Sequence, residues 1–329
     1  MQNRAMPSFS RRRFLRIAAA ALPVGLAVGL CPETGFGKET TSVPLRLWRG
    51  TALGAEAEIQ LAHPDPAVAA ALLDDAVTTL ARLEQVFSLY RPDSALSRLN
   101  REGVLAAPPL DLVRLLGEAA QFHAETGGIF DVTVQPLWAL YAAHFRTPGA
   151  DPAGPPAAAV AAALARVDGG AVQVSAHEIR LRRPGMAITL NGIAQGYITD
   201  RVCEQFQAAG LPHVLTDLGE IRALGTHPEN RPWQAAVEKP DHPGSFPRIL
   251  PLENSALATS SGHRSRFDPA GRFHHLLHPR TGLSPAITAS LTVQAATATT
   301  ADALSTAGLM MDRTTFQTLV TAYGARAFF

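Results

Sequence analysis

The sequence predicts an α+β fold, and three observations support this fold class. Hydrophobic residues make up 47% of the 329 residues and charged residues 17%, a composition typical of a globular chain with a sizeable core. Stretches with the 3.6-residue periodicity of helices occur together with short apolar stretches typical of strands. These elements interleave without a regular strand–helix–strand period, so we expect an α+β arrangement and not a doubly wound parallel sheet.

The first thirty residues differ in composition from the rest of the chain. A basic stretch, SRRRFLR at 10–16, precedes the uncharged apolar run IAAAALPVGLAVGL at 17–30. This order indicates an export signal, because the apolar run is short for a membrane span and basic residues come before it. The pair Arg11 and Arg12 is similar to the twin-arginine signal. We therefore expect residues 1–31 to be a twin-arginine export signal and the mature protein to be periplasmic.

The same segment bears on anchoring, charge and redox chemistry. Cys31 would suit a lipoprotein, but Leu30 stands where a small residue is required, so we expect a soluble exported protein and leave a membrane tether open. Loss of residues 1–30 removes five arginines and no acidic residue, which changes the formal net charge from +1 to −4. That charge argues against binding to nucleic acid. Only Cys203 certainly remains after export, so no disulfide framework is expected.

The other elements follow from periodicity and from turn residues, after an expected linker at 32–46. Residues 147–170 are low in complexity and predict a Pro/Gly loop, a short alanine helix and a glycine loop, which makes them the best candidate for an insertion or hinge. Longer helices are expected at residues 65–85, 110–125, 193–209 and 300–311. Strands are expected at residues 186–190, 213–218, 233–237, 255–259, 272–277 and 291–296.

The stretch HHLLHPRTG at 274–282 places three histidines close together. In an extended segment His274 and His278 lie on one face about 13 Å apart and His275 points the other way, so the segment supplies at most one ligand to a zinc ion. Two interpretations stay open. Either one imidazole transfers a proton while Arg280 and the following turn contact an anion, or the histidines are solvated or packed in the core.

Two further motifs point to a phosphate and to a hard cation. In ITLNGIAQGYITD at 188–200 a buried strand turns at Gly192 into a helix, whose N-terminal N–H groups suit a phosphate, although glycines are also common in plain turns. In TTADALSTAGLMM at 299–311, Asp302 and Thr306 are four residues apart on one helix face. Their oxygens suit Mg²⁺, although Asp302 is also explained as a first-turn acid stabilised by the helix dipole.

Seven motifs follow one another over about residues 45–320. They are FSLYRPDSALSRLN, GIFDVTVQPL, LNGIAQGYITD, LTDLGEIRALG, ALATSSGHRSRF, HHLLHPRTG and ADALSTA. Together they resemble the ApbE family of flavin transferases. The resemblance implies one T-fold-related domain over residues 47–329, with mixed or antiparallel sheets and flanking helices. It also implies an FAD:protein FMN transferase, which uses Mg²⁺ to split FAD, releases AMP, and joins FMN through a phosphoester bond to a Thr or Ser of a partner flavoprotein.

The resemblance also assigns roles to individual residues. It implies that Mg²⁺ is bound by Asp302, Thr306 and a backbone oxygen of Gly192. His275 is the expected base that takes the proton from the acceptor hydroxyl. The positions implied to contact FAD are Tyr90, Ile129, Phe130, Asp131, Thr189, Gln195 and His275.

Three residues depart from the family pattern. Gln195 replaces a lysine that many relatives have, Thr189 replaces a frequent aspartate, and His278 replaces the usual aspartate before Pro-Arg-Thr-Gly. These departures keep two alternatives open, an FAD pyrophosphatase that yields FMN and AMP, and a non-catalytic protein that binds or delivers flavin. The NGIAQGY variant is similar to exported relatives linked to the maturation of nitrous oxide reductase. We therefore expect an acceptor in an exported or membrane respiratory redox protein, with membrane contact only through that partner or an anchor.

Overall fold

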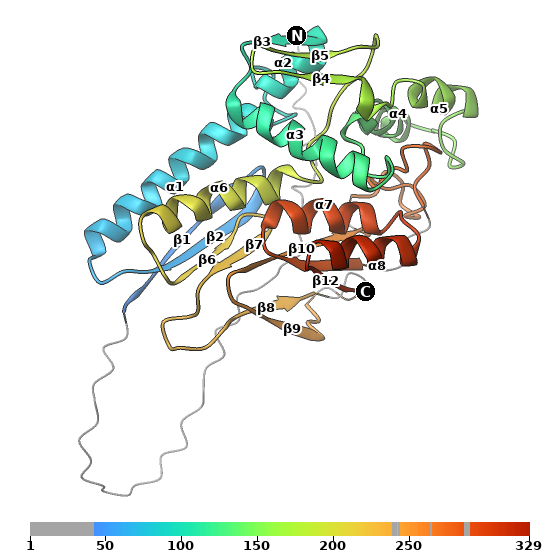
Figure 1. Cartoon of the computed structure of the whole chain (residues 1–329). Coiled ribbons are helices and arrows are strands. Elements are labelled where there is room, and N and C mark those ends of the chain that lie inside the picture. Colours follow the sequence, from blue (N-terminus) through green and yellow to red (C-terminus); the bar gives the residue numbers. More distant parts are fainter. Residues whose placement is uncertain (1–42, 239–241, 243, 264, 286–289) are drawn as a thin grey trace, which may run out of the picture.

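The computed structural model describes residues 43–238, 242, 244–263, 265–285 and 290–329. The expected export signal and residues 32–42 of the expected linker lie outside the described residues. Strand β1 (Leu45–Ala52) begins two residues inside the expected linker range. The α+β class is confirmed, with helices packed against antiparallel sheets (Figure 1).

A seven-stranded antiparallel sheet forms the centre of the molecule, in the order β1-β2-β6-β7-β10-β11-β12. The first hairpin pairs β1 with β2 (Ala55–Ala62), and β2 then pairs with a strand that comes much later in the chain. In that pairing Glu58 lies opposite Asp217. The remaining strands are β6 (Val214–Asp217), β7 (Ile221–Leu224), β10 (Ser255–Ser261), β11 (Ser290–Ala295) and β12 (Arg326–Phe328).

Helices cover one face of this sheet (Figure 1). They are α1 (Pro66–Phe87), α6 (Ala194–Ala208), α7 (Ala298–Gly308) and α8 (Arg313–Ala322). Helix α7 packs on β10 and β11, and α6 packs on β6 and β7, with α6 and α7 in contact with each other. Alternate strand residues such as Leu291 and Val293 point into the main core beneath these helices. The helix-facing side of the sheet is therefore the side that holds α6 and α7 together.

The opposite face of the sheet is covered in part by a hairpin of β8 (Trp233–Val237) and β9 (Arg248–Leu252). A second core lies between the hairpin and the sheet, because the strand residues that alternate with the helix-facing ones are also apolar. It consists of Leu215, Ile221, Ala223, Trp233, Ala235, Val237, Leu250, Leu252 and Leu257.

The segment between α1 and α6 forms a separate layer beyond the helices (Figure 1). It contains α2 (Ala95–Glu102), α3 (Leu110–Glu125), α4 (Gln135–Arg146), α5 (Ala157–Leu164) and a small sheet of β3 (Val104–Ala106), β4 (Val172–Val174) and β5 (Glu178–Leu181). Two short 3-10 turns are also present, η1 (Val132–Val134) directly before α4 and η2 (Gly169–Ala171) after α5. The expected loop–helix–loop at residues 147–170 is confirmed, with α5 as its helix.

Two of the expected strands are wrong. Residues 186–190 form no strand, because the side chain of Asn100 bonds both the N–H (2.6 Å) and the carbonyl (2.8 Å) of Ile188, and the N–H of Thr189 donates to the carbonyl of Val132 (2.8 Å). Residues 272–277 form only an isolated bridge between His274 and Arg266. Both segments are apolar and buried at intervals, which imitates a strand pattern, but their backbone partners are side chains and loops.

The other expected helices and strands are confirmed to within a few residues. Within the described part of the chain, no helix combines the length and the apolar character needed to cross a membrane.

Candidate active site

Helices α6 and α7 cross closely at their N-terminal ends. Gly196, in the first turn of α6, permits this approach, because an added Cβ would lie 2.6 Å from the carbonyl carbon of Ala298 and 2.8 Å from the Cα of Thr299. The N–H of Gly196 donates to Oδ2 of Asp302, at 3.1 Å. A glycine at the start of one helix therefore places its backbone against the carboxylate of the next.

Asp302 is a buried carboxylate with few partners. Its side chain is 4% exposed, and among the described residues the N–H of Gly196 is its one hydrogen-bond donor. Burial raises the pKa of Asp302 to about 7, the Gly196 N–H opposes this rise, and the negative charge of Asp200 adds to it. A buried carboxylate in this position would be stabilised by a cation.

The turn before α6 contacts α7 one helical turn after Asp302. An added Cβ at Gly192 would lie 3.0 Å from Oγ1 and 2.9 Å from Cγ2 of Thr306. Asp302 and Thr306 share one face of α7, and Gly192 and Gly196 both come from the start of α6. The three residues that the family resemblance assigns to Mg²⁺ thus lie together. Their carboxylate, hydroxyl and carbonyl oxygens are the ligand atoms that hard cations prefer. Binding of the cation itself stays a prediction.

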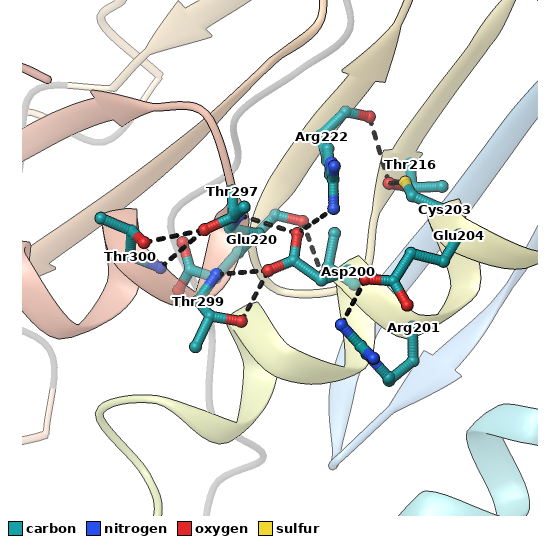
Figure 2. Close-up of polar contacts among 12 residues, drawn as sticks. Asp200, Arg201, Cys203, Glu204, Thr216, Glu220, Arg222, Thr297, Thr299 and Thr300 are labelled. Atoms are coloured by element: carbon teal, nitrogen blue, oxygen red, sulfur yellow. Dashed lines mark hydrogen bonds and ion pairs between the residues drawn. The ribbon is translucent and has the colours of Figure 1, made fainter. Parts of the chain in front are cut away.

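Asp200, which the sequence analysis did not single out, connects the two helices (Figure 2). Its carboxylate accepts hydrogen bonds from the N–H groups of Ala298 and Thr299 (both 2.8 Å) and from Oγ1 of Thr299 (2.6 Å). Arg222 on β7 forms an ion pair with the same carboxylate at 2.5 Å. Asp200 therefore caps α7 from outside that helix and fixes the turn that leads to Asp302.

Gln195 lies at the start of α6 and brings an unused donor to the site. The residue is 6% exposed, and among the described residues its Nε2 has no hydrogen-bond partner. The amide rests against Gly219, which has φ +104, and an added Cβ there would lie 2.8 Å from the Cδ of Gln195. Helix α6 also has no side-chain cap at Ile193. The N–H groups of Ala194 and Gly196 are already used, in bonds to the carbonyl of Leu190 (2.8 Å) and to Asp302 (3.1 Å). The buried amide of Gln195 therefore offers a donor to an anionic or carbonyl oxygen.

The loop after α3 is held in place by Asp131. Its carboxylate accepts from the backbone N–H (2.7 Å) and hydroxyl (2.5 Å) of Thr133 and from the N–H of Gly169 (3.0 Å). Phe130 is 4% exposed and packs edge-on against Phe122. The structure thus gives Asp131 and Phe130 positioning contacts within the protein.

The other expected FAD positions are exposed or half-buried. Tyr90 is 65% exposed in the turn after α1, and Ile129 and Thr189 are half-buried. Contact between FAD and any of the positions from Tyr90 to His275 stays a prediction.

The three histidines of 274–282 have different surroundings. His274 is 2% exposed, its Nε2 lies 2.9 Å from the carbonyl oxygen of Pro285, and burial lowers its pKa. The ring of His275 is half-buried and its centroid lies 6.3 Å from that of His274, with the planes at 69°. Within the described residues, no group of three or more His, Cys, Asp or Glu side chains is arranged to bind a metal ion.

His278 stabilises the turn that follows it. Its Nδ1 accepts from the N–H of Arg280 at 3.2 Å, and its carbonyl accepts from the N–H of Gly282 at 2.8 Å. An aspartate oxygen commonly makes the same bond to the N–H two residues later, so the histidine can replace aspartate here. Burial, followed by the charge of Arg280, lowers the pKa of His278. Arg280 itself donates to the carbonyl of Gly127 and joins this turn to the loop after α3.

Comparison with known families identifies the chain. The profile of the ApbE family matches residues 53–329, which includes all of the site described above. The chain belongs to the ApbE family. Its fold agrees with solved members, among them the flavin transferase ApbE from Vibrio cholerae (TM-score 0.72, 26% identity, 86% of this chain and 93% of that one). The ApbE protein from Thermotoga maritima gives a TM-score of 0.76 at 25% identity, over 86% of this chain and 93% of that one.

Curated ApbE relatives carry the name FAD:protein FMN transferase. The protein from Haemophilus influenzae is 33% identical over 67% of this chain and 66% of its own length, so the match spans just under two thirds of that relative. The protein from Salmonella typhimurium is 28% identical over 91% of this chain and 86% of its own length.

Asp200 is the residue of this site that the sequence analysis missed. Its position four residues after Gly196, on the same face of α6, was the available signal.

Proposed function

We propose that this chain is an Mg²⁺-dependent FAD:protein FMN transferase. It transfers FMN from FAD to a Thr or Ser hydroxyl of a partner flavoprotein, forms a phosphoester bond and releases AMP. The observation that carries the proposal is the placement of Asp302 and Thr306 against the start of α6, in an ApbE-family chain whose relatives are named for this reaction.

The charges around Asp302 support binding of a divalent cation. A buried carboxylate with one N–H donor and a second carboxylate nearby, that of Asp200, is favoured as an anion only if a cation is close. Asp302, Thr306 and the backbone of Gly192 would hold Mg²⁺, which when bound neutralises phosphate oxygens as a Lewis acid.

Other groups at the site support the binding of a pyrophosphate. The buried Nε2 of Gln195, at the start of α6, donates to an oxygen of the ligand. Gln195 brings a hydrogen bond and no charge, so more of the phosphate charge falls to the cation. His275 takes the proton from the acceptor hydroxyl while its oxygen attacks the FMN phosphorus. The new P–O bond forms as the anhydride bond to AMP breaks, and AMP leaves with the electron pair.

The test is an assay of the purified chain with FAD and Mg²⁺, with and without acceptor domains from exported redox proteins. AMP is measured by chromatography, and FMN attachment by the mass of the acceptor. We expect AMP and labelled acceptor in equal amounts, and little AMP without acceptor. AMP release that is independent of acceptor would instead indicate an FAD pyrophosphatase. Bound FAD without AMP in either case would indicate a protein that only binds or delivers flavin.

A paired substitution connects the activity to the site. Asp302→Asn removes the charge with little change in shape, and we expect loss of Mg²⁺-dependent transfer in a folded protein. Asp74→Asn, on the exposed face of α1, is the matched control and should transfer at the wild-type rate. Full activity of Asp302→Asn would contradict the cation assignment.

We also propose that the chain acts in the periplasm after twin-arginine export. The support is the basic and apolar pattern of residues 10–30. The acceptor is then an exported or membrane respiratory redox protein. Fractionation of cells that express the full chain tests this, and accumulation of unprocessed protein in the cytoplasm would contradict it.

A further inference from the structure

Three hydroxyl groups form a chain of hydrogen bonds that ends at Thr306. Oγ of Ser305 donates to the backbone carbonyl of Asp302 at 3.1 Å. Oγ of Ser260, on the helix-facing side of β10, lies 2.9 Å from Oγ of Ser305 and 3.3 Å from Oγ1 of Thr306. Ser305 is 0% exposed, whereas Ser260 and Thr306 are half-buried. The chain of hydroxyls therefore runs from the interior toward the candidate cation site.

The direction of these hydrogen bonds is determined by their inner end. A carbonyl oxygen can only accept, so the single proton of Ser305 is used in its bond to Asp302. The bond between Ser260 and Ser305 then requires the proton of Ser260. The remaining contact requires the proton of Thr306, which donates to Ser260. In this arrangement each hydroxyl donates once, and the lone pairs of Thr306 Oγ1 are left for another partner.

We propose that Ser260 and Ser305 are positioning residues that make Thr306 a ligand for a divalent cation. A hydroxyl binds a cation through a lone pair, so its proton has to be directed elsewhere. Ser260 accepts that proton, and Ser305 prevents Ser260 from donating back. This inference rests on the proposed function, since it concerns the same Mg²⁺ site.

The same strand provides an internal comparison. Thr259, the neighbour of Ser260, points to the opposite face of the sheet, where its Oγ1 lies 2.8 Å from Oγ1 of Thr292. This pair lies on the face of the sheet that points away from α7, and its hydrogen bond joins no member of the hydroxyl chain. Removing the hydroxyl of Thr259 therefore tests the effect of losing a buried hydroxyl pair from β10 without changing Thr306.

The experiment measures Mn²⁺ binding to the full chain by electron paramagnetic resonance, because Mn²⁺ prefers the same oxygen ligands as Mg²⁺. We expect Ser260→Ala and Ser305→Ala to weaken binding roughly ten-fold, as is typical when groups that orient a metal ligand are lost. Ser260→Thr keeps the hydroxyl and should bind nearly as well as wild type, and Thr259→Ala should bind like wild type. Affinities of both alanine variants within two-fold of wild type would overturn the inference.

A double-mutant cycle separates orientation from general damage. If Ser260 acts only by orienting Thr306, then Ser260→Ala in a Thr306→Ala background should cause no additional loss of Mn²⁺ affinity. An equal loss in both backgrounds would show that Ser260 acts through the fold and would refute the inference. Absence of Mn²⁺ binding by the wild-type chain would refute the proposed cation site itself, and this result is distinct from the other two.

Discussion

Replacement of Asp200 by alanine should destabilise the protein more than any exposed charge change. The carboxylate is almost entirely buried, with its side chain 3% exposed, and Arg222 opposite it is 13% exposed. The substitution removes one ion pair at 2.5 Å and three hydrogen bonds to the first residues of α7. It leaves a buried guanidinium and two backbone N–H groups without their acceptor.

The size of the effect follows from these losses. Breaking a buried ion pair by removing one partner costs about 3–5 kcal/mol, and loss of a helix cap costs about 1 kcal/mol. We therefore expect Asp200→Ala to lower the free energy of unfolding by about 4–6 kcal/mol. At about 2 °C per kcal/mol for a chain of this size, the Tm should fall by about 8–12 °C. Replacing both partners, with Arg222→Met added, should cost less than the two single losses together.

Urea unfolding followed by far-UV circular dichroism measures this change. The matched control is Glu204→Gln on the same helix, because Glu204 pairs with Arg201 at the surface, with the side chains 44% and 26% exposed. That substitution should cost less than about 1 kcal/mol. If Asp200→Ala loses no more stability than Glu204→Gln, the carboxylate does not hold α7 and the reasoning is wrong.

Three further outcomes are expected. Gly196→Ala should destabilise the protein and abolish Mn²⁺ binding, because a Cβ would meet the backbone of α7, whereas Gly117→Ala, with nothing within 4 Å, should stabilise α3 by up to about 1 kcal/mol in urea unfolding. Burial, with the charges of Glu58 and Glu56, raises the pKa of Asp217 from 3.8 to about 7. The folded state therefore holds this proton more tightly than the unfolded state, and the protein loses stability as the pH rises from about 4 to 7. Asp217→Asn should therefore be more stable than wild type at pH 8 but not at pH 4, and an unchanged difference across thermal melts at both values would contradict this. His275→Ala should slow FMN transfer at saturating FAD more than it weakens FAD binding, and an unchanged rate would remove it as the base.

Local patterns predicted the parts of the fold whose partners are near in sequence. The α3 boundaries follow from periodicity and a glycine stop, and β8 from a short apolar run between turns. The expectation for residues 186–190 failed because the decisive partner is the side chain of Asn100, 88 residues away. Strand β1 was missed because it is an edge strand that leaves Leu45 and Leu47 exposed.

The site shows the same division between local and distant information. Asp302 and Thr306 could be paired from a spacing of four residues on one helix. Asp200 could not be connected to α7, because the residues it caps lie 98 and 99 positions later. The family resemblance supplied Gly192, whose contact with Thr306 arises only when the two helices cross.

The strand order has a consequence for how the molecule assembles. Strand β2 ends at Ala62 and its sheet neighbour β6 starts at Val214, so the first hairpin has no partner until the whole layer between them has been made. Closing such a long loop is entropically costly and slows folding. The contact between Gly196 and Asp302 spans a further 106 residues. The candidate cation site therefore forms only after α6 and α7 have met, and metal binding would report that this long-range contact has been made.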